Sequence, residues 1–505
     1  MRELAVPRLL LGLALVALGI STANAAEITL RPDLRGHVSE LRTIYPWQGL
    51  RSARGEAQPE LQLAPGEDVG GRRVIGSHAL PDLRVLQLSG EIEEGDTDRL
   101  REILFESGPL GWSPTLIVFD SPGGDMLEGI RMGVMLAAAI EGGGGDSPLE
   151  GVAVLSGSRC LSACALAFAL ATDGYWLDRR FIEAGAELGF HMGRLPEDQM
   201  QQVAQVERVM DFTYDVVRAY NRLTDTGANP PLLLTMALQH RRPDTFFHLR
   251  GGQRSWFFGF TPVSRGVLSQ PVAASGMSLW TLGDVCLQNL ISSRVPVNGL
   301  RTDFIGFWGN GADLLTEVTA RAGRNSIAHD ASGSDVACRV TMRPDGSIAL
   351  HPFLLPFDCR SRVRTGPVPQ RCLLPAQAPG RADPTVTVGM LADVVGCANG
   401  RLTERGYDAT MPIYFEDQGQ TRITEIGRAR QVLRPVNMRD APGLDGHRLA
   451  TLQPGEAVSV QGCTLRDDGQ GVWMNIRHAA GEGWVSARFL TPIGDRIAEL
   501  IPWED

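Results

Sequence analysis

The chain has 505 residues, 43% of them hydrophobic, which favours a globular protein of roughly two to four domains. Its formal net charge of −10 argues against a nucleic-acid-binding protein, because binding phosphates requires clustered positive charge that the sequence does not contain. All 48 basic residues are arginines, and the chain contains no lysine.

The first 25 residues have the organisation of an export signal. Arg2 and Arg8 precede a short apolar run, and residues 23–25 form the small-x-small pattern of a signal-peptidase site. The apolar run is shorter than the roughly 20 residues that span a membrane. We therefore expect a signal peptide over residues 1–25 and a periplasmic or secreted mature protein; anchoring by an uncleaved N-terminus is the less favoured alternative.

The predicted elements begin after residues 26–80, which are polar, rich in Gly, Pro and Arg, and expected to be a loosely ordered lead-in. Residues 81–272 then alternate short apolar runs with segments of helical periodicity, which indicates an α/β domain with a parallel sheet. Asp96 is a plausible N-cap for the first helix. The strands are expected over 83–92, 114–120, 151–157, 174–178 and 186–192, and the helices over 96–107, 120–140, 160–172, 196–221 and 229–240.

A region over 276–425 follows, and its sequence does not indicate a function. Its clearest element is a hairpin over residues 339–353, where Asp345-Gly346 is a turn signal. Several of the eight cysteines lie in this region. An exported protein favours disulfides over zinc, there is no CxxC pair, and we expect neither a metal nor a cofactor.

The last block, residues 432–493, has short strands separated by Pro and Gly turns, typical of a small all-β barrel. It resembles the bacterial SH3-like domain through Asn437-Met438-Arg439 and Gly483-Trp484-Val485. The resemblance implies a module that binds the cell wall, such as peptidoglycan, or an envelope protein, and serves as a tether or targeting arm. The alternative is that Trp473 and Trp484 are only barrel core.

Three motifs in the α/β block occur in the order found in the ClpP and crotonase superfamily. Ser121-Pro122-Gly123-Gly124 follows a strand, Ser162 follows another strand and opens a helix, and His191 ends a third strand. The block resembles exported ClpP-like proteins, which implies a ClpP/crotonase-like spiral of ββα units. In the serine peptidases of that superfamily the matching positions are a nucleophile, Ser162, a base, His191, and the oxyanion donors Gly123 and Ala163.

The absence of lysine excludes the serine–lysine mechanism of the signal peptide peptidase A branch of this fold, so a base must be a histidine. A third residue would orient that histidine, and Asp244 is our choice by its position after two long helices. The cysteines that flank the serine, Cys160 and Cys164, depart from the peptidase pattern. If both lie on one helix, a disulfide is feasible near the upper end of its range and would make Ser162 redox-sensitive.

The sequence thus predicts an exported ClpP-like serine hydrolase, a peptidase acting on peptides or proteins, with an SH3-like binding module and a candidate homo-oligomeric assembly. The alternative is a catalytically inactive envelope scaffold, in which the ClpP-like fold supplies an oligomerisation surface. Acyl-CoA chemistry, as in the crotonase branch, is not expected outside the cytoplasm.

Overall fold

The architecture is taken from a computed structural model of the chain. It describes residues 25–45, 83–105, 114–141, 149–172, 179–192, 206–225, 232–242, 244–272, 325–329, 336–342, 347–354, 374–375, 385–398, 400–402, 428–466 and 471–491. The expected strand over 174–178 lies outside these ranges. Of the expected signal peptide over 1–25, only Ala25 lies within them.

A seven-stranded mixed sheet forms the centre of the α/β unit. Its five middle strands are parallel, as the alternation of strands and helices predicts, and a short antiparallel strand closes each edge. In sheet order the strands are β1 (Glu27–Leu30), β3 (Arg84–Ser89), β4 (Thr115–Asp120), β5 (Leu149–Val154), β7 (Arg180–Glu183), β10 (Thr261–Ser264) and β2 (Arg42–Thr43).

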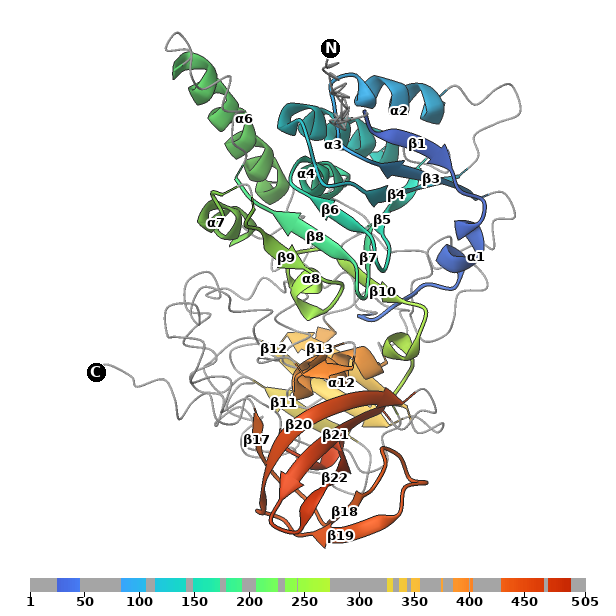
Figure 1. Ribbon diagram of the computed structural model, residues 1–505, viewed down its shortest axis with the longest axis vertical. Coiled ribbons are helices and arrows are strands. Elements are labelled where there is room, and N and C mark those ends of the chain that lie inside the picture. The colour runs from blue at the N-terminus through green and yellow to red at the C-terminus, as the bar shows by residue number, and fades with distance from the viewer. Residues whose placement is uncertain are drawn as a thin grey trace, which may run out of the picture.

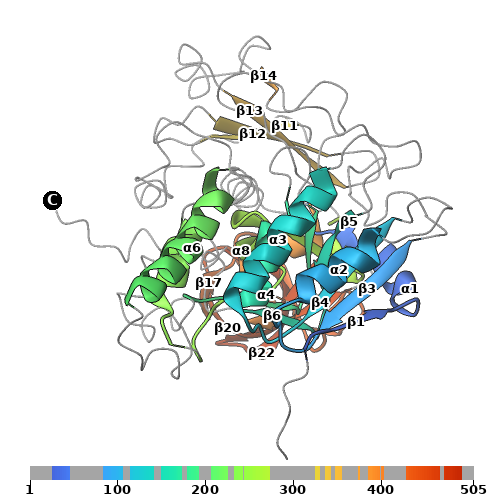
Figure 2. The ribbon, with the colours of Figure 1, turned by 90° about the horizontal axis from the view of Figure 1, so that it is seen from above.

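Both faces of this sheet are buried, because successive side chains of a strand point to opposite sides. In β4, Ile117 and Phe119 join a core with the helices, whereas Leu116 and Val118 join a second core with Val38. Figures 1 and 2 show the helices of the first core side by side over one face. They are α2 (Asp96–Phe105), α3 (Met126–Glu141) and α4 (Ala163–Leu170), and α1 (Leu34–Ser39) carries Val38.

A second sheet has three strands, and two of them end next to Ser162 and His191. Strand β6 (Arg159–Leu161) is parallel to β8 (Glu187–Phe190), which pairs with β9 (Phe247–Leu249). The bridge between Ser121 and Cys160 joins it to the end of β4. The two expected long helices are present as α6 (Val206–Asp225) and α7 (Leu232–Gln239), followed by the short α8 (Gln253–Phe257). None of the helices in the described part is both long and apolar enough to cross a membrane.

The expectation of a loosely ordered lead-in is wrong for its first part. Strand β1 pairs antiparallel with β3 along its whole length, and β2 pairs with β10 at the opposite edge of the same sheet. Leu41 and Val38 are fully buried. Residues 26–45 therefore belong to the α/β unit, because two short apolar patches among polar residues suffice to cover the edges of a sheet.

The middle region contains the predicted hairpin. Strands β12 (Val336–Met342) and β13 (Ile348–Leu354) pair antiparallel, with Met342 opposite Ile348, and β11 (Asn325–His329) and β14 (Leu374–Pro375) extend this sheet at both edges. The turn itself lies outside the described residues. A helix, α12 (Val388–Val395), and a small ladder of β15 (Cys397–Ala398) and β16 (Arg401–Leu402) follow.

The C-terminal block is an all-antiparallel six-stranded sheet, as predicted. Trp473 is 2% exposed but is not among the side chains of the barrel's hydrophobic core, whereas Trp484 is half-buried. Of the two tryptophans, only Trp484 is thus accessible to a partner. In sheet order the strands are β17 (Ala429–Gln431), β20 (Ala457–Arg466), β21 (Gly471–His478), β22 (Gly481–Ser486), β18 (Val436–Arg439) and β19 (Arg448–Leu452).

The barrel and the α/β unit share one hydrophobic core, in which α12 lies between them (Figure 1). Thr387 caps this helix and donates a side-chain hydrogen bond to the carbonyl of Ile44 at 2.7 Å. Tyr45 stacks on Trp256 at 5.8 Å. The barrel is therefore packed against the α/β unit rather than held on a free arm.

Candidate active site

Three chain segments meet at the carboxyl ends of parallel strands. Residues 121–124 follow β4, Ser162 follows β6, and His191 follows β8. The Cβ that Gly123 lacks would lie only 2.7 Å from the Cβ of Ser162. Because these strands run in the same direction within joined sheets, motifs separated along the sequence converge at one edge.

Ser162 and His191 are in direct contact. The Oγ of Ser162 lies 2.6 Å from Nε2 of His191, across 29 residues of sequence. His191 is 7% exposed, and its ring packs against Phe246 at 4.7 Å between ring centroids. A half-buried serine hydroxyl bonded to an imidazole nitrogen has the geometry in which the imidazole can accept the hydroxyl proton.

Ser162 has an unusual backbone conformation. Its φ of 56° and ψ of −121° make it the one non-glycine residue with positive φ in the described part of the chain. Such a conformation costs of order 1–3 kcal/mol and persists where surrounding contacts impose it. Here the amide of Ser162 donates to the carbonyl of Gly189 at 2.9 Å, and the turn delivers the serine from a strand to the N-terminus of α4.

Close helix packing holds that N-terminus in place. A Cβ on Gly129 of α3 would lie 2.4 Å from the carbonyl oxygen of Ala163, and one on Gly133 would lie 2.6 Å from the Cβ of Leu170. Every residue of α4 is buried. The glycines of α3 therefore let α4 approach so closely that the two backbones are in contact. This packing fixes the position of Ser162, which lies at the N-terminus of α4.

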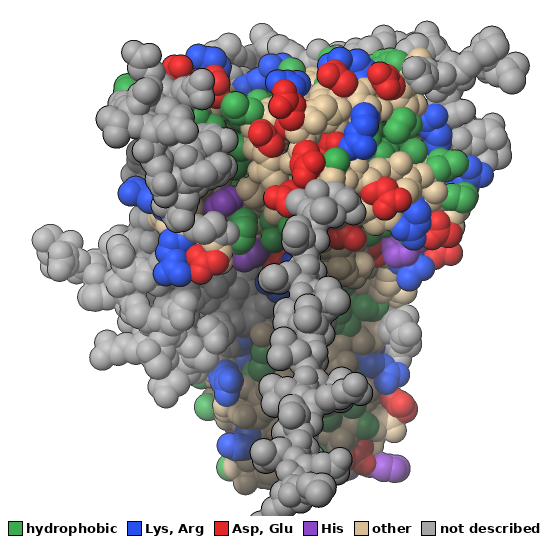
Figure 3. All heavy atoms as spheres, turned by 45° about the horizontal axis from the view of Figure 1, so that its top comes forward, with side chains coloured by type: hydrophobic (Ala, Val, Ile, Leu, Met, Phe, Trp, Pro, Cys, Tyr) green, Lys and Arg blue, Asp and Glu red, His purple; other side chains and the backbone are tan. Residues whose placement is uncertain are grey.

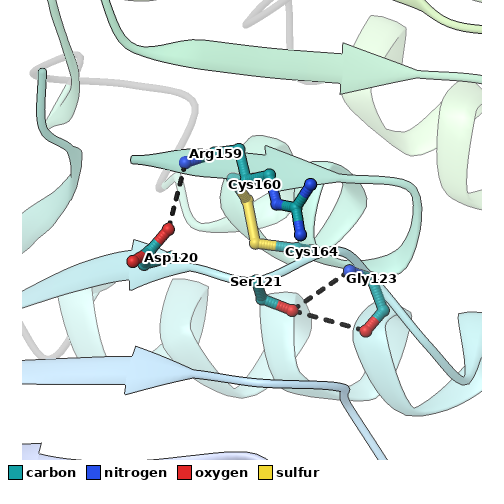
Figure 4. Close-up of a disulfide and its surroundings, with 6 residues drawn as sticks. All are labelled: Asp120, Ser121, Gly123, Arg159, Cys160 and Cys164. Atoms are coloured by element: carbon teal, nitrogen blue, oxygen red, sulfur yellow. Dashed lines mark hydrogen bonds between the residues drawn. A yellow bond between two sulfur atoms is a disulfide. The ribbon is translucent and has the colours of Figure 1, made fainter. Parts of the chain in front are cut away.

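A disulfide joins Cys160 and Cys164 across the serine, with 5.2 Å between their Cα atoms. Figure 4 shows it above the loop that holds Ser121 and Gly123. Cys160 lies in β6 and Cys164 in α4, so the expectation that one helix carries both cysteines is wrong. The disulfide instead closes the strand-to-helix turn that holds Ser162.

The two expected oxyanion donors differ in their present partners. The amide of Ala163 has no acceptor among the described residues, whereas the amide of Gly123 donates to Oγ of the buried Ser121 at 3.1 Å (Figure 4). The amide of the neighbouring Gly124 also has no acceptor in the described part of the chain. Sequence reasoning did not identify Ser121 as the internal acceptor, although its place two residues before Gly123 suits such a turn.

The environment of His191 keeps its imidazole neutral. Burial lowers the pKa of His191, a backbone interaction with Arg242 raises it, and the nearby His240 lowers it further. Nδ1 is buried, and no carboxylate of the described residues bonds to it. The structure does not bring Asp244 to this nitrogen: its carboxylate is 62% exposed and accepts two hydrogen bonds from Arg242, at 3.1 and 2.8 Å.

On one face of the molecule the charged side chains do not gather into a patch of one sign. On the face in Figure 3, acidic and basic side chains of the described residues are interspersed. Within the described ranges, no three or more His, Cys, Asp or Glu residues are grouped so that they could hold a metal ion.

Comparisons with known proteins bear on two parts of the chain. Residues 434–491 match the bacterial SH3 domain family, which confirms the expected C-terminal domain. A mutant of ClpP1 from Listeria monocytogenes is a structural match at 16% identity and a TM-score of 0.24, over 33% of this chain and 82% of that chain. A search of curated proteins found no match.

Proposed function

We propose that the α/β unit is a ClpP-like serine hydrolase with the spiral ββα arrangement of that superfamily, exported after removal of residues 1–25. The 2.6 Å contact between Ser162 Oγ and His191 Nε2 carries the proposal. Three further features support it: the positive φ of Ser162, the amide of Ala163, which has no acceptor in the described ranges, and the order of the motifs in the sequence.

In the proposed reaction, Oγ of Ser162 attacks a carbonyl carbon while its proton passes to Nε2 of His191. The negative charge of the tetrahedral intermediate develops beside the amide of Ala163 and the positive end of α4. His191 returns the proton to the leaving amine or alcohol. Water then cleaves the acyl-enzyme by the same route, which releases an acid and restores the serine.

The second oxyanion donor is a glycine amide of the 121–124 loop. Gly123 is the expected donor, and its amide would exchange Ser121 for the substrate oxyanion, which is a stronger acceptor because it is charged. The neighbouring Gly124 amide has no acceptor among the described residues and is the alternative. In both cases the glycine's proximity to Ser162 places the donor next to the attacked carbon.

We propose peptides or proteins as the substrate class and a cell-wall polymer or envelope protein as the partner of the barrel. The barrel's core contacts with the α/β unit would hold a bound partner in a constant position relative to Ser162. Half-buried Trp484 is an aromatic side chain of the barrel that a partner could contact. Assembly into a homo-oligomer remains a prediction.

Hydrolysis assays test this function. The mature protein is incubated with an activated ester and with a mixture of peptides, beside the Ser162→Ala and His191→Ala variants. We expect turnover that falls by about 10³-fold or more in each variant, because neither group works without the other. Turnover that persists in Ser162→Ala, with folding verified by circular dichroism, contradicts the assignment.

A catalytically silent scaffold is the second candidate. It is favoured by two observations at the same site: Nδ1 of His191 lacks a carboxylate partner within the described residues, and the amide of Gly123 is bonded to Ser121. In that case the Ser162–His191 hydrogen bond only stabilises the turn. Absence of turnover on both substrate classes, together with binding of peptidoglycan or envelope protein by the barrel, would favour it.

A further inference from the structure

The structure places the expected mature N-terminus in a buried polar site that the proposed reaction does not use. Signal cleavage after Ala25 makes Ala26 the first residue. Ala26 is fully buried, and its backbone nitrogen lies 3.2 Å from Oδ2 of Asp96, which is also fully buried. Its carbonyl accepts a hydrogen bond from the guanidinium of Arg99 at 2.9 Å.

Asp96 does not act as the simple N-cap that the sequence predicts. Its carboxylate accepts from the backbone amides of Glu93, at 2.8 Å, and of Ala26, and it pairs with Arg99. The first turn of α2 is capped from elsewhere, since the amide of Thr97 donates to Glu128 of α3 at 2.8 Å. The buried carboxylate is thus directed at the point where the processed chain would begin.

We propose that Asp96 is the binding site for the α-ammonium group that export processing creates on Ala26, and that this ion pair secures the loop that supports the catalytic serine. Hydrolysis of the Ala25–Ala26 peptide bond by an envelope signal peptidase consumes one water. It leaves a carboxylate on Ala25 and an amine on Ala26, which takes up a proton. The neutral amide donor that now faces Asp96 becomes a positively charged donor at the same place.

Charge and burial favour such a pair. A buried carboxylate is stabilised by a charged donor more than by a neutral amide, and charge-assisted hydrogen bonds are roughly twice as strong. Arg99 is the opposing positive charge, but its side chain is 49% exposed and therefore screened by solvent. The neighbouring segment Glu91-Ile92-Glu93-Glu94 adds three carboxylates to the local balance.

Continuous backbone contacts connect this site to the candidate active site. Asp96 holds the amide of Glu93, and the adjacent Ile92 donates to the carbonyl of Gly123 at 2.7 Å and accepts from Asp125 at 2.8 Å. A Cβ on Gly124 would lie 2.2 Å from the carbonyl oxygen of Ile92. Ordering at Ala26 would therefore be transmitted through residues 92–93 to the loop that faces Ser162.

The absence of lysine gives a selective test. The α-amine is the sole primary amine of the chain, so every stable amide formed with an amine-reactive ester reports on it, and peptide mass mapping separates that amide from an ester on Ser162. A fusion protein cleaved so that Ala26 is the first residue is compared with the same protein carrying an uncut N-terminal extension. Glu94→Gln, which removes an exposed carboxylate of the same segment, is the matched control for Asp96→Asn.

We expect acylation of the native processed protein to be at least about tenfold slower than in guanidinium without reductant, because each unit of raised amine pKa lowers its reactive fraction about tenfold. Asp96→Asn should restore fast labelling, and Glu94→Gln should not. Processing should raise Tm by about 3 °C or more in the parent protein and in Glu94→Gln, but not in Asp96→Asn.

Fast native labelling, or equal Tm values for processed and extended forms of the parent, would overturn the proposal without any variant. An exported protein whose N-terminal residue is not Ala26 would also overturn it. The inference rests on the export part of the proposed function and not on Ser162 activity. Labelling of the amine and Tm do not depend on hydrolysis. Both measurements therefore test the ion pair between Ala26 and Asp96 even if Ser162 is inactive.

Discussion

The Cβ that Gly123 lacks would lie 2.7 Å from the Cβ of Ser162 and 2.8 Å from the carbonyl oxygen of Leu161. Gly123 also has a φ of +108°, which only glycine adopts readily. Two independent constraints therefore require glycine here, one from the backbone and one from the serine turn.

Gly123→Ala should destabilise the protein by about 2–4 kcal/mol and reduce Ser162 reactivity more than tenfold, since the clash displaces the turn. Gly481→Ala is the matched control, because Gly481 has a φ of +118° but no atom within 4 Å of the added Cβ. Chemical denaturation and active-site labelling of both variants measure the two effects. If both variants lose the same stability and Gly123→Ala leaves the labelling of Ser162 unchanged, the close approach of Gly123 to Ser162 is contradicted.

Gly129→Ala tests the packing of α3 on α4. Alanine normally favours a helix over glycine by about 1 kcal/mol, but here its Cβ would lie 2.4 Å from the Ala163 carbonyl oxygen. We expect a net loss of about 1–3 kcal/mol. Gly36→Ala, on the exposed side of α1 with nothing within 4 Å, should instead stabilise slightly. In urea titrations the unfolding free energy should fall in Gly129→Ala and rise slightly in Gly36→Ala. A rise in both variants would be inconsistent with the packing of α3 on α4.

The two described disulfides should differ in what their removal changes. Replacing Cys397 and Cys463 by serine opens a link with a sequence separation of 66 and should cost about 4 kcal/mol, whereas replacing Cys160 and Cys164, four apart, should cost about 2 kcal/mol by loop entropy. The second replacement, or reduction, should nevertheless change Ser162 labelling more, because that disulfide closes its turn. Denaturation and labelling of both double variants check this. Equal labelling in both would remove the redox hypothesis.

The pH dependence should follow the lowered pKa of His191. The folded protein keeps the imidazole neutral below its ordinary value of 6.5, so the acid limb of the activity profile should lie below that pH. Between 6.5 and the lowered pKa, the unfolded chain binds a proton that the folded chain does not. Stability from this group is therefore intact above 6.5 and decreases as the pH falls through that window.

His191→Gln separates this titration from others in the chain. The pKa of His248 is also lowered, chiefly by burial, and its contribution is the same in both proteins. The difference in unfolding free energy between parent and variant should thus change with pH only in the acidic window. A difference that is constant from neutral to acidic pH would show that burial does not perturb His191.

The sequence predicts the parts of the fold that local patterns encode. Runs of apolar residues form the strands β3, β4 and β8, and the resemblance carried by the three motifs implies the contact between Ser162 and His191. The Pro and Gly turns of the C-terminal block predict the SH3-like barrel, and its sequence matches the bacterial SH3 domain family. These features depend on residues close in sequence.

Other features depend on partners far along the chain. The hydrogen bond between Thr387 and Ile44 spans 343 residues, and no periodicity indicates it. The edge strand β1 is four residues long, too short for a pattern. Only the position of Asp244 in the sequence suggests it as the residue that orients His191. Its carboxylate instead accepts two hydrogen bonds from Arg242, two residues before it. Whether a carboxylate orients an imidazole is decided by loop geometry, which sequence spacing does not encode.

Labelling with a fluorophosphonate, followed by peptide mass mapping, tests the central claim most directly. We predict a single adduct on Ser162 in the mature protein, lost in Ser162→Ala and in His191→Ala, because both depend on the same 2.6 Å hydrogen bond. An adduct on another serine, or none at Ser162 with and without reductant, would contradict an activated nucleophile and leave the serine as part of a structural turn.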